Sequence, residues 1–206
     1  MIDTTVKFFP VSMVKMDMTT YPRYEMPEGF YITGYREGDE QHWADIAMEQ
    51  FAIEKMESAL NMFHGEFTSH PEMWERLKNA CLFAVEEKTG KVAAMLALWE
   101  GGICGKDLRR VHWVATREEF QGKGIIKAML TYAMDLYHEQ NGTGPCVLAT
   151  GTQNWKAIRI YKKFGFEPYL CLPHQPEPDG NVNLENDREG WSIIDGKIAE
   201  FEESRK

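Results

Sequence analysis

The pattern of apolar and polar positions predicts strands alternating with helices along most of the chain. Stretches rich in β-branched and aromatic residues favour strands, and we predict these at residues 30–33, 81–86, 92–99, 111–116, 146–150 and 167–172. Apolar residues at steps of three and four favour amphipathic helices, and we predict these at residues 39–51, 53–63, 124–139 and 154–164, with one more beginning at Pro71. The pattern therefore indicates a domain of mixed α and β structure.

The two ends of the chain carry weaker patterns than the middle. Residues 1–27 form an N-terminal extension that suits an added strand, or an arm packed on the domain or on a second subunit. Its apolar residues cluster at Phe8, Phe9, Val11 and Val14. We place the core of the domain at residues 28–172. We expect residues 173–206 to complete the same domain as a loop, a last strand at 191–194 and a charged, solvated tail.

A turn with two glycines separates the strand at 111–116 from the helix at 124–139. Gly122 and Gly124 let a bulky anion approach the backbone without a Cβ in the way. The start of the helix adds about half a positive charge and unpaired N–H donors, so a pyrophosphate would fit there. A glycine turn that binds nothing explains the same residues, and the glycine pair alone leaves both interpretations open.

A second helix start follows the strand at 146–150. Asn154 is a suitable N-cap, and Gly165 is suited to end the helix in left-handed geometry. Asn154 and Tyr161 are seven residues apart, so they share a helix face at a separation of about 10 Å along the axis. That separation suits two points on an extended, thiol-bearing arm.

At these positions the chain resembles the GNAT superfamily of acetyl-CoA-dependent N-acetyltransferases. The family's acyl-CoA motif, Arg/Gln-x-x-Gly-x-Gly/Ala after a strand, is met from Gln121 onward, with Ile126 in place of the small last residue. Its downstream signature, an Asn opening a helix that ends in Tyr-x-x-x-Gly-Phe, is met by Asn154, Tyr161, Gly165 and Phe166. The resemblance implies an α/β (α+β) fold of GNAT type. We expect a mixed, mostly antiparallel central sheet of about six to seven strands, flanked by helices, with a splayed strand pair for the cofactor.

The resemblance also implies acetyl-CoA as cosubstrate and a role for each motif residue. The strand would offer backbone groups of Val114, Ala115 and Thr116 to the pantetheine arm. The turn would hold the pyrophosphate through Gln121, Gly122, Lys123, Gly124, Ile125, Ile126 and Lys127. Asn154 would hydrogen-bond the pantetheine amides, and Tyr161 would be the general acid that protonates the departing thiolate. The alternative for Tyr161 is a core tyrosine with an ordinary hydrogen-bond partner.

Acetyl transfer to an amine needs an acid and a base. A thiol with a pKa near 8.5 and a tyrosine with a pKa near 10 are close to balanced, so Tyr161 needs little adjustment as the acid. An alkylamine arrives protonated at neutral pH, and the candidate bases are Glu100 and His112. Glu100 lies at a strand end, and alternation along the next strand puts His112 on the same face as Val114. A packed, hydrogen-bonded histidine is the other interpretation of His112.

Two stretches are candidates for the acceptor side. The loop at residues 100–107 lacks the Gly-Lys-Ser/Thr ending of a phosphate-binding P-loop, and we expect a flexible segment near the acceptor entrance. Four apolar residues in and after the second predicted helix suit either an adaptable acceptor wall or ordinary core, and they are Met56, Met62, Phe63 and Phe67.

Composition and charge exclude several classes of partner. The formal charge of −9 argues against nucleic acid and acidic membranes, because both are bound mainly through Lys and Arg. No apolar run approaches the roughly 20 residues needed to span a bilayer, so we expect a cytoplasmic protein. The cysteines are widely spaced and the histidines form no ligand pattern, so we expect reduced thiols and no metal.

Three functions are compatible with the sequence. The first is an N-acetyltransferase that moves an acetyl or longer acyl group from acetyl-CoA to a small-molecule or peptide amine, by direct attack in a ternary complex. The second is a catalytically silent CoA-binding sensor or regulatory domain, and the third is a scaffold whose glycine turn is structural. The presence of both Asn154 and Tyr161 favours the first. The terminal segments also suit a homodimer interface.

Overall fold

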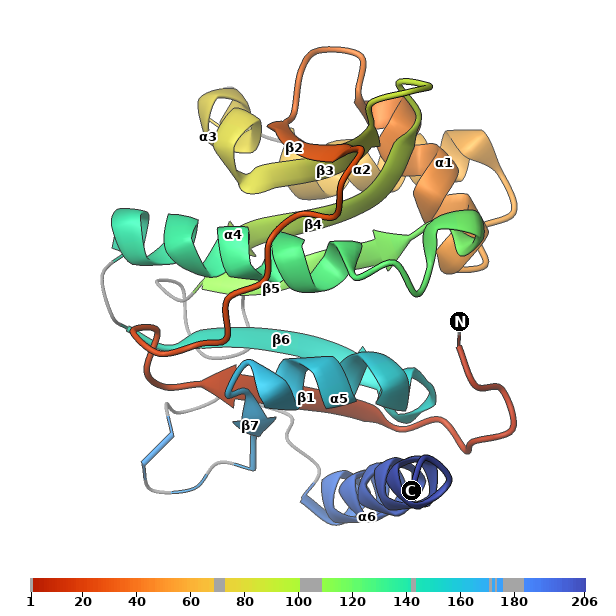
Figure 1. The fold of residues 1–206 in the computed structure, drawn as a ribbon, viewed down its shortest axis with the longest axis vertical. Helices are drawn as coiled ribbons and strands as arrows, with labels where there is room; N and C mark the ends of the chain where they lie inside the picture. The colour runs from red at the N-terminus through yellow and green to blue at the C-terminus, as the bar shows by residue number, and fades with distance from the viewer. Residues whose placement is uncertain are drawn as a thin grey trace. The chain divides into compact units, whose positions relative to one another are not determined.

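Seven strands form one mixed, mostly antiparallel sheet in the described part of the chain (Figure 1). The computed structural model describes residues 2–68, 73–100, 109–141, 144–170, 172, 174–175 and 184–206. The order across the sheet is β2-β3-β4-β5-β6-β1-β7. The strands are β1 (Pro10–Lys15), β2 (Phe30–Gly34), β3 (Cys81–Glu86), β4 (Val92–Glu100), β5 (Arg109–Thr116), β6 (Cys146–Gly151) and β7 (Glu167–Pro168). The predicted fold class is therefore confirmed.

Six α-helices and two short 3-10 helices lie in the same described residues. The α-helices are α1 (Glu40–Gln50), α2 (Met56–Phe67), α3 (Met73–Ala80), α4 (Ile125–Asn141), α5 (Trp155–Lys163) and α6 (Leu184–Glu203). The 3-10 helices are η1 (Glu118–Phe120) and η2 (Thr152–Asn154). The sequence pattern predicted all of the α-helices except α6. Pro71, the predicted start of α3, lies outside the described residues, as do residues 101–107 of the predicted flexible loop.

Contacts between residues divide the chain into two compact units. Unit 1 comprises Met1–Pro22, Glu100–Arg110 and Tyr137–Lys206, and unit 2 comprises Arg23–Trp99 and Val111–Leu136. The parallel pairing of β5 with β6, at Arg109↔Cys146 and Arg110↔Val147, falls within unit 1. The opening of this strand pair beyond Arg110 stays a prediction.

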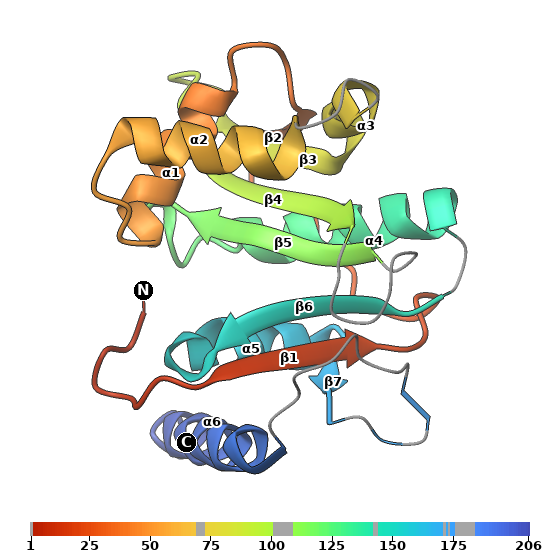
Figure 2. The same cartoon turned by 180° about the vertical axis from the view of Figure 1, so that it is seen from behind.

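Helices cover both faces of the strands in unit 2. Helices α1 and α2 lie on one face of β2, β3 and β4, and α4 lies on the other (Figures 1 and 2). Strands β2 and β3 pair antiparallel from Phe30↔Glu86 to Gly34↔Leu82. A Cβ at Gly34 would lie 2.0 Å from the Lys78 carbonyl oxygen, so only glycine lets the end of α3 approach β2 this closely.

The core under α1 and α2 is aromatic. Trp43, Phe63 and Phe67 have no exposed surface, and their ring centroids lie 5.0–6.1 Å apart. Phe63 and Phe67 are therefore core residues and not a wall open to an acceptor. Of the other two residues proposed for that wall, Met56 is half-buried and packs against this core, whereas Met62 is exposed.

The N-terminal extension contributes an inner strand to unit 1. β1 pairs antiparallel with β6 from Pro10↔Gly151 to Lys15↔Cys146, and on its other edge with β7 at Met13↔Pro168. The hydroxyl of the buried Thr152 ties the start of this strand to η2, because it donates to the Lys7 carbonyl at 2.6 Å and accepts from the Phe9 N–H at 2.9 Å. The predicted added strand is therefore confirmed, and it packs on its own chain.

A helix occupies the place of the last predicted strand. Residues 191–194 lie inside α6, so that prediction is wrong. Trp191 and Ile194 are both buried, and their spacing of three positions puts them on one helix face. Gly190 lets this helix approach the β1 segment, since a Cβ there would lie 3.1 Å from Val11 Cγ1 and 3.2 Å from Phe9 Cβ. Packing against β1 therefore stabilises residues 191–194 as part of a helix and not as a strand.

The strand predicted at residues 167–172 is also shorter than expected. Of the described residues in this stretch, only Glu167–Pro168 pair as β7. Beyond them the side chain of buried Gln175 takes the place of a neighbouring strand. Its Oε1 accepts the N–H groups of Leu170 at 2.9 Å and of Leu172 at 3.3 Å, and its Nε2 donates to the Pro168 carbonyl at 2.9 Å. These backbone groups are satisfied without a strand partner.

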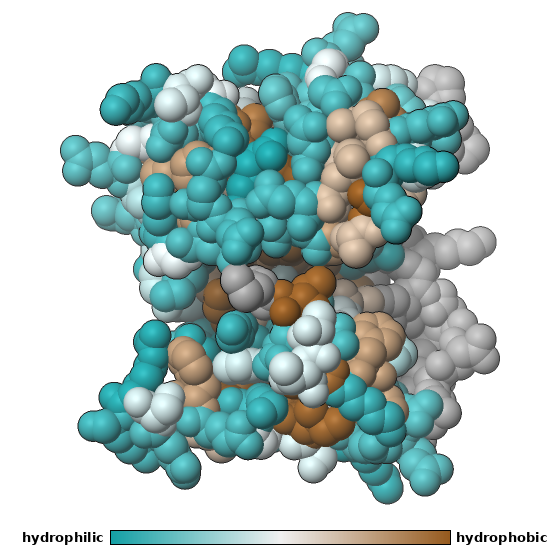
Figure 3. Space-filling view, turned by 90° about the vertical axis from the view of Figure 1, so that its right-hand side faces the viewer, coloured by the Kyte–Doolittle hydropathy of each residue, from teal (hydrophilic) through white to brown (hydrophobic). Residues whose placement is uncertain are grey.

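One face of the molecule is mainly polar. Figure 3 shows a face on which hydrophilic residues dominate and apolar residues are confined to small areas. Large apolar side chains that stay exposed come from separate parts of the chain, at Ile2, Phe8, Tyr31, Met62, Trp74, Tyr132 and Leu172. Such dispersion is normal for a solvated protein surface.

Candidate active site

The glycine turn of unit 2 has an unusual backbone conformation. Gly122 has φ +79° and Gly124 has φ +89°, values at which a side chain is strained. A Cβ built at either glycine meets no atom within 4 Å, so open space lies beside both. These glycines are therefore required by backbone conformation and not by crowding within the chain.

Unpaired backbone donors accumulate at this turn. The N–H groups of Lys127 and Ala128 donate to the Gly124 carbonyl at 3.0 and 3.3 Å, which closes the first turn of α4. In the described part of the chain no hydrogen bond is found for the five N–H groups from Gly122 to Ile126. The first turn of α4 contains no acidic residue. The turn thus presents free donors at the positive end of a helix, as anion sites do.

Contacts from α1 hold the approach to this turn. Glu49 Oε1 accepts the Glu118 N–H at 2.6 Å, and Glu49 Oε2 lies 3.2 Å from Arg117 Nη1. The Arg117 Nε–H also donates to the Val92 carbonyl of β4 at 2.9 Å. Gln121 Nε2 donates to the Thr116 carbonyl at 3.1 Å, which links the turn back to the end of β5. The predicted pyrophosphate residues therefore start from a fixed loop.

Two lysines flank the turn without an acidic partner among the described residues. Lys123 Nζ lies 4.8 Å from the centre of the Phe120 ring, and Lys127 Nζ lies 5.2 Å from the centre of the Tyr24 ring. Cation–π contacts of this kind are weak enough to give way to an ion pair with a phosphate. Both lysines can therefore contribute charge to an anion held by the turn.

The regular alternation assumed for β5 is wrong, because the strand is irregular at Trp113. Trp113 has φ +50°, an unusual conformation for an aromatic residue. Its ring packs on Trp43 of α1 at 4.7 Å, while the preceding residue, His112, reaches Glu66 of α2. Two consecutive side chains thus turn to helices on the same face. The argument from alternation that put His112 on the face of Val114 no longer holds.

Thr116 keeps an unsatisfied polar atom at the end of β5. Its Oγ1 is buried and forms no hydrogen bond with the part of the chain that the structure describes. Ala115 is buried and Val114 half-buried on the same strand. A buried hydroxyl without a partner costs free energy, so it marks a place where a ligand could supply one. This fits the predicted role of residues 114–116 beside a polar arm.

His112 has a carboxylate neighbour that the sequence pattern did not identify. His112 Nε2 lies 3.3 Å from Glu66 Oε1, and both side chains keep about a quarter of their surface exposed, 23% and 25%. Glu66 lies near the end of α2, where an acidic residue is common and carries no spacing signal. The side chain of the other candidate base, Glu100, lies outside the described residues.

Asn154 lies in unit 1, at the N-cap of α5 as predicted. Its side chain does not cap the helix, and its Nδ2 donates instead to Thr150 Oγ1 at 3.2 Å. This bond crosses from the helix start to the end of β6. The amide is half-buried, and no described residue donates a hydrogen bond to its carbonyl oxygen, which could accept one from a ligand N–H.

Tyr161 is buried on the same helix, with only 6% of its surface exposed. Its ring lies 6.2 Å from that of Phe166, and the chain ends α5 through Gly165 at φ +85° as predicted. Burial raises the pKa of Tyr161 above its ordinary value. The near balance with a thiol that the sequence suggested therefore does not hold in the free protein, and the hydroxyl stays protonated at all physiological pH values.

The predicted site residues thus fall into two groups. Residues 114–116 and 121–127 lie together in unit 2, and Asn154 and Tyr161 share α5 in unit 1. Among the described residues there is no cluster of three metal-ligating side chains and no helix long and apolar enough to cross a membrane. Cys81 and Cys146 are buried thiols that form no disulfide with another described residue, and burial raises the pKa of the Cys81 thiol, which keeps it protonated.

Sheet order, helix placement and the glycine turn before α4 together match an acetyltransferase fold of GNAT type. The model of the acetyltransferase (GNAT) family matches residues 41–166, more than half of the chain, and the chain belongs to this family.

Individual relatives match over parts of their length. An uncharacterized N-acetyltransferase of Methanocaldococcus jannaschii is 31% identical over 88 residues, which make up 41% of this chain and 38% of that protein. A GCN5-related N-acetyltransferase from Sphaerobacter thermophilus has a similar structure, with TM-score 0.60, 21% identity, and 79% of this chain and 50% of that chain covered. A GNAT-family acetyltransferase from Colwellia psychrerythraea gives TM-score 0.58, 15% identity, and coverage of 79% and 54%. The two structural likenesses concern the fold alone, and the chain spans about half of each structure.

Proposed function

We propose that the chain transfers an acetyl group from acetyl-CoA to an amine by direct attack in a ternary complex. The observation that carries this proposal is the turn from Gly122 to Ile126, where five unpaired N–H groups meet the positive end of α4. The family relationship supports acyl transfer as the chemistry. No covalent acyl-enzyme is needed, because holding both reactants in register can supply an effective molarity on the order of 10⁵ M or more.

The turn and the end of β5 would bind the cosubstrate. The N–H groups of the turn, with Lys123 and Lys127, suit the pyrophosphate, which supplies the anionic part of CoA. Backbone groups of residues 114–116 suit the amides of the pantetheine arm, and a backbone N–H near Val114 would polarise the thioester carbonyl as it gains negative charge. Asn154 would bind the same arm through its amide.

Tyr161 would act as the general acid. Its burial keeps the phenol protonated, so a proton is present whenever the thiolate leaves. The raised pKa of Tyr161 in the free protein makes its hydroxyl a weak acid, so it keeps its proton until the developing thiolate comes close. Negative charge on the sulfur in the transition state then favours transfer.

The pair of His112 and Glu66 would act as the base for the acceptor ammonium. The imidazole would take the proton, and the Glu66 carboxylate, 3.3 Å from Nε2, would stabilise the imidazolium that forms. Glu100 stays the alternative base from the sequence, at the end of β4.

Titration calorimetry with acetyl-CoA and with CoA, followed by thiol-release assays over a panel of amines, tests the function. We expect micromolar binding of both ligands and release of thiol with at least one alkylamine, amino acid or peptide amine. Binding without thiol release for any amine would instead establish a silent CoA-binding domain. Absence of binding would discard both functions and leave a scaffold.

Variants of the proposed base should alter the pH–rate profile differently. We expect His112→Gln to lower kcat/KM roughly 100-fold and to remove the acidic limb of the profile, because no imidazole then accepts the proton. Glu66→Gln should move that limb to lower pH, because a neutral amide stabilises the protonated imidazole less. Glu57→Gln, at an exposed position of the same helix, is the control and should leave the profile unchanged. An unmoved profile in both His112 and Glu66 variants would leave Glu100 as the candidate.

A further inference from the structure

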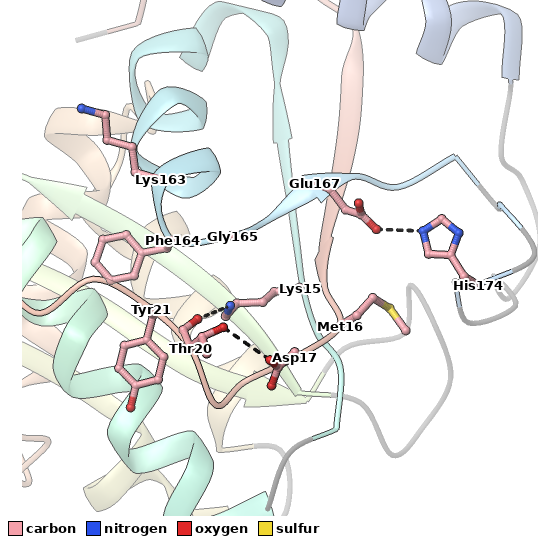
Figure 4. A pocket seen from close by; sticks show the side chains of 10 residues that line it. All are labelled: Lys15, Met16, Asp17, Thr20, Tyr21, Lys163, Phe164, Gly165, Glu167 and His174. Atoms are coloured by element: carbon pink, nitrogen blue, oxygen red, sulfur yellow. Dashed lines mark hydrogen bonds and ion pairs between the residues drawn. The ribbon is translucent and has the colours of Figure 1, made fainter.

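Unit 1 contains a pocket at the opposite end of α5 from Asn154. Its volume is about 540 Å³, and its lining comes from the end of β1, the following loop, the end of α5 and the start of β7 (Figure 4). The lining residues are Lys15, Met16, Asp17, Thr20, Tyr21, Lys163, Phe164, Gly165, Glu167 and His174. Lys15 is the residue of this set whose environment is unusual.

Lys15 is a buried cation. It is the last residue of β1, opposite Cys146 of β6, and only 3% of its surface is exposed. Its ammonium donates one hydrogen bond, of 2.7 Å, to the Thr20 carbonyl. Gly165 makes room for it, since a Cβ at that position would lie 2.9 Å from Lys15 Nζ. Lys15 is therefore buried with two of its three N–H donors unpaired within the described residues.

The carboxylates around the pocket are engaged elsewhere. Asp17 accepts bonds from the backbone and hydroxyl of Thr19, at 2.8 and 2.6 Å. Glu167 lies 3.0 Å from His174 Nε2. Among the described residues no carboxylate oxygen lies within ion-pair distance of Lys15, although Asp17 is near enough to act on its charge. A buried charge without a counter-ion is costly, so an anion is the partner that this site lacks.

We propose that this pocket binds a small organic monocarboxylate, with its carboxylate on the Lys15 ammonium and its apolar body against Met16, Tyr21 and Phe164. The two free N–H donors of Lys15 match a carboxylate, which accepts several hydrogen bonds. A phosphate dianion suits the pocket less, because one lysine balances only half its charge while Asp17 and Glu167 repel it. This proposal does not depend on the proposed acetyl transfer.

Binding should take up protons at the alkaline pH values at which Lys15 is partly deprotonated. Burial lowers the pKa of Lys15, against the opposing influence of Asp17 and Cys146. An anion bound to the ammonium favours the charged form and raises this pKa again. Besides Asp17, the titratable groups that line the pocket with Lys15 are Tyr21, Lys163, Glu167 and His174. Proton uptake is therefore attributed to Lys15 only if it persists in the His174→Gln and Lys163→Met variants.

Calorimetric titrations of sodium hexanoate, hexan-1-ol and inorganic phosphate into the full chain test the proposal without any substitution. Hexanoate should bind at least roughly tenfold more tightly than the other two ligands. Hexan-1-ol affinity equal to that of hexanoate would show that the pocket binds only the apolar body and that Lys15 contributes nothing, which would overturn the proposal. Tighter binding of phosphate would overturn the assignment to carboxylates, and no binding of any probe would overturn the site.

Two lysine variants locate the binding. Lys15→Met keeps a linear side chain without charge, and hexanoate affinity should fall roughly tenfold or more. Lys163→Met is the matched control, since Lys163 lines the same pocket but its charged end points away from the other labelled side chains in Figure 4. Unchanged affinity in the Lys15 variant would overturn the proposal. Gly124→Val should bind hexanoate normally, which separates this site from the proposed cofactor turn.

Discussion

Replacing Tyr161 by Phe is expected to lower kcat for acetyl transfer by roughly 100- to 10,000-fold, the range typical of a lost general acid. The change removes only the hydroxyl, so the ring contact with Phe166 and the packing of α5 are kept. The KM for acetyl-CoA and its calorimetric affinity should change little, because the proton is transferred only as the thiolate leaves. Initial-rate assays of thiol release and a titration with acetyl-CoA measure the two quantities.

The pH dependence that the Tyr161 hydroxyl gives to stability and rate has a defined sign. Burial raises the folded-state pKa of Tyr161 above the unfolded value near 10, so the protonated form is favoured in the folded protein. This contribution to stability is complete below pH 10 and is lost as pH rises from there through the folded pKa. The acid itself should therefore stay protonated across ordinary assay conditions, and Tyr161 should produce no basic limb in the rate below about pH 10.

Tyr137→Phe is the matched control for the hydroxyl. Tyr137 is also buried with a raised pKa, but its hydroxyl donates to the Pro145 carbonyl at 2.6 Å. Its loss should reduce the free energy of unfolding by about 1 kcal/mol and leave kcat unchanged. If Tyr161→Phe kept full kcat, Tyr161 would be a core tyrosine and another donor would protonate the thiolate.

Replacing Gly124 by Val is expected to weaken acetyl-CoA binding by roughly 100-fold. A Cβ at Gly124 meets no protein atom within 4 Å, so the side chain would fill the space beside the unpaired N–H groups. The residue also has φ +89°, where a β-branched side chain is strained and the start of α4 would shift. Both effects would keep the N–H donors of the turn from reaching the phosphate groups of acetyl-CoA. Calorimetry with acetyl-CoA measures the loss.

Gly90→Val separates the loss of the site from backbone strain. Gly90 lies in the turn between β3 and β4, has φ +70°, and also has no atom within 4 Å of a built Cβ. Gly90→Val should lower the free energy of unfolding about as much as Gly124→Val does, which chemical denaturation measures. Its affinity for acetyl-CoA should equal that of the unsubstituted chain. Equal affinity of the Gly124 and Gly90 variants would show that the turn does not bind the cosubstrate.

Local signals were sufficient for much of the fold. The spacing of apolar residues predicted five helices and the strands of unit 2, because each element buries one face and the periodicity of its residues records that face. Gly165 was predicted to have left-handed backbone geometry, and it has positive φ. Gly122 and Gly124, predicted as positions where an anion can approach the backbone, have positive φ as well. Asn154 was placed correctly at a helix start, although its side chain bonds to Thr150 and not to the helix.

Non-local contacts explain where the sequence misled. Residues 191–194 have a strand-like composition, yet Trp191 and Ile194 pack as a helix face within unit 1. The break at Trp113 has no local signal, since it depends on the position of Trp43 on another element. Glu66 was missed because its partner His112 is 46 residues away along the chain. Lys15 was missed because its burial depends on distant residues, with Cys146 opposite it on β6 and Gly165 beside its ammonium.

The sequence by itself therefore determined the class of fold, the glycine turn and the order of the motif residues, because these depend on periodicity and on backbone conformations that few residues tolerate. Only the tertiary structure decided the inner position of β1, the pairing of His112 with Glu66 and the burial of Tyr161 and Lys15. The physical reason is that burial and electrostatic environment arise from residues far apart in the chain. Burial and electrostatic environment determine the protonation state and the ligand affinity of a side chain, and they arise only when residues far apart in the chain are packed together.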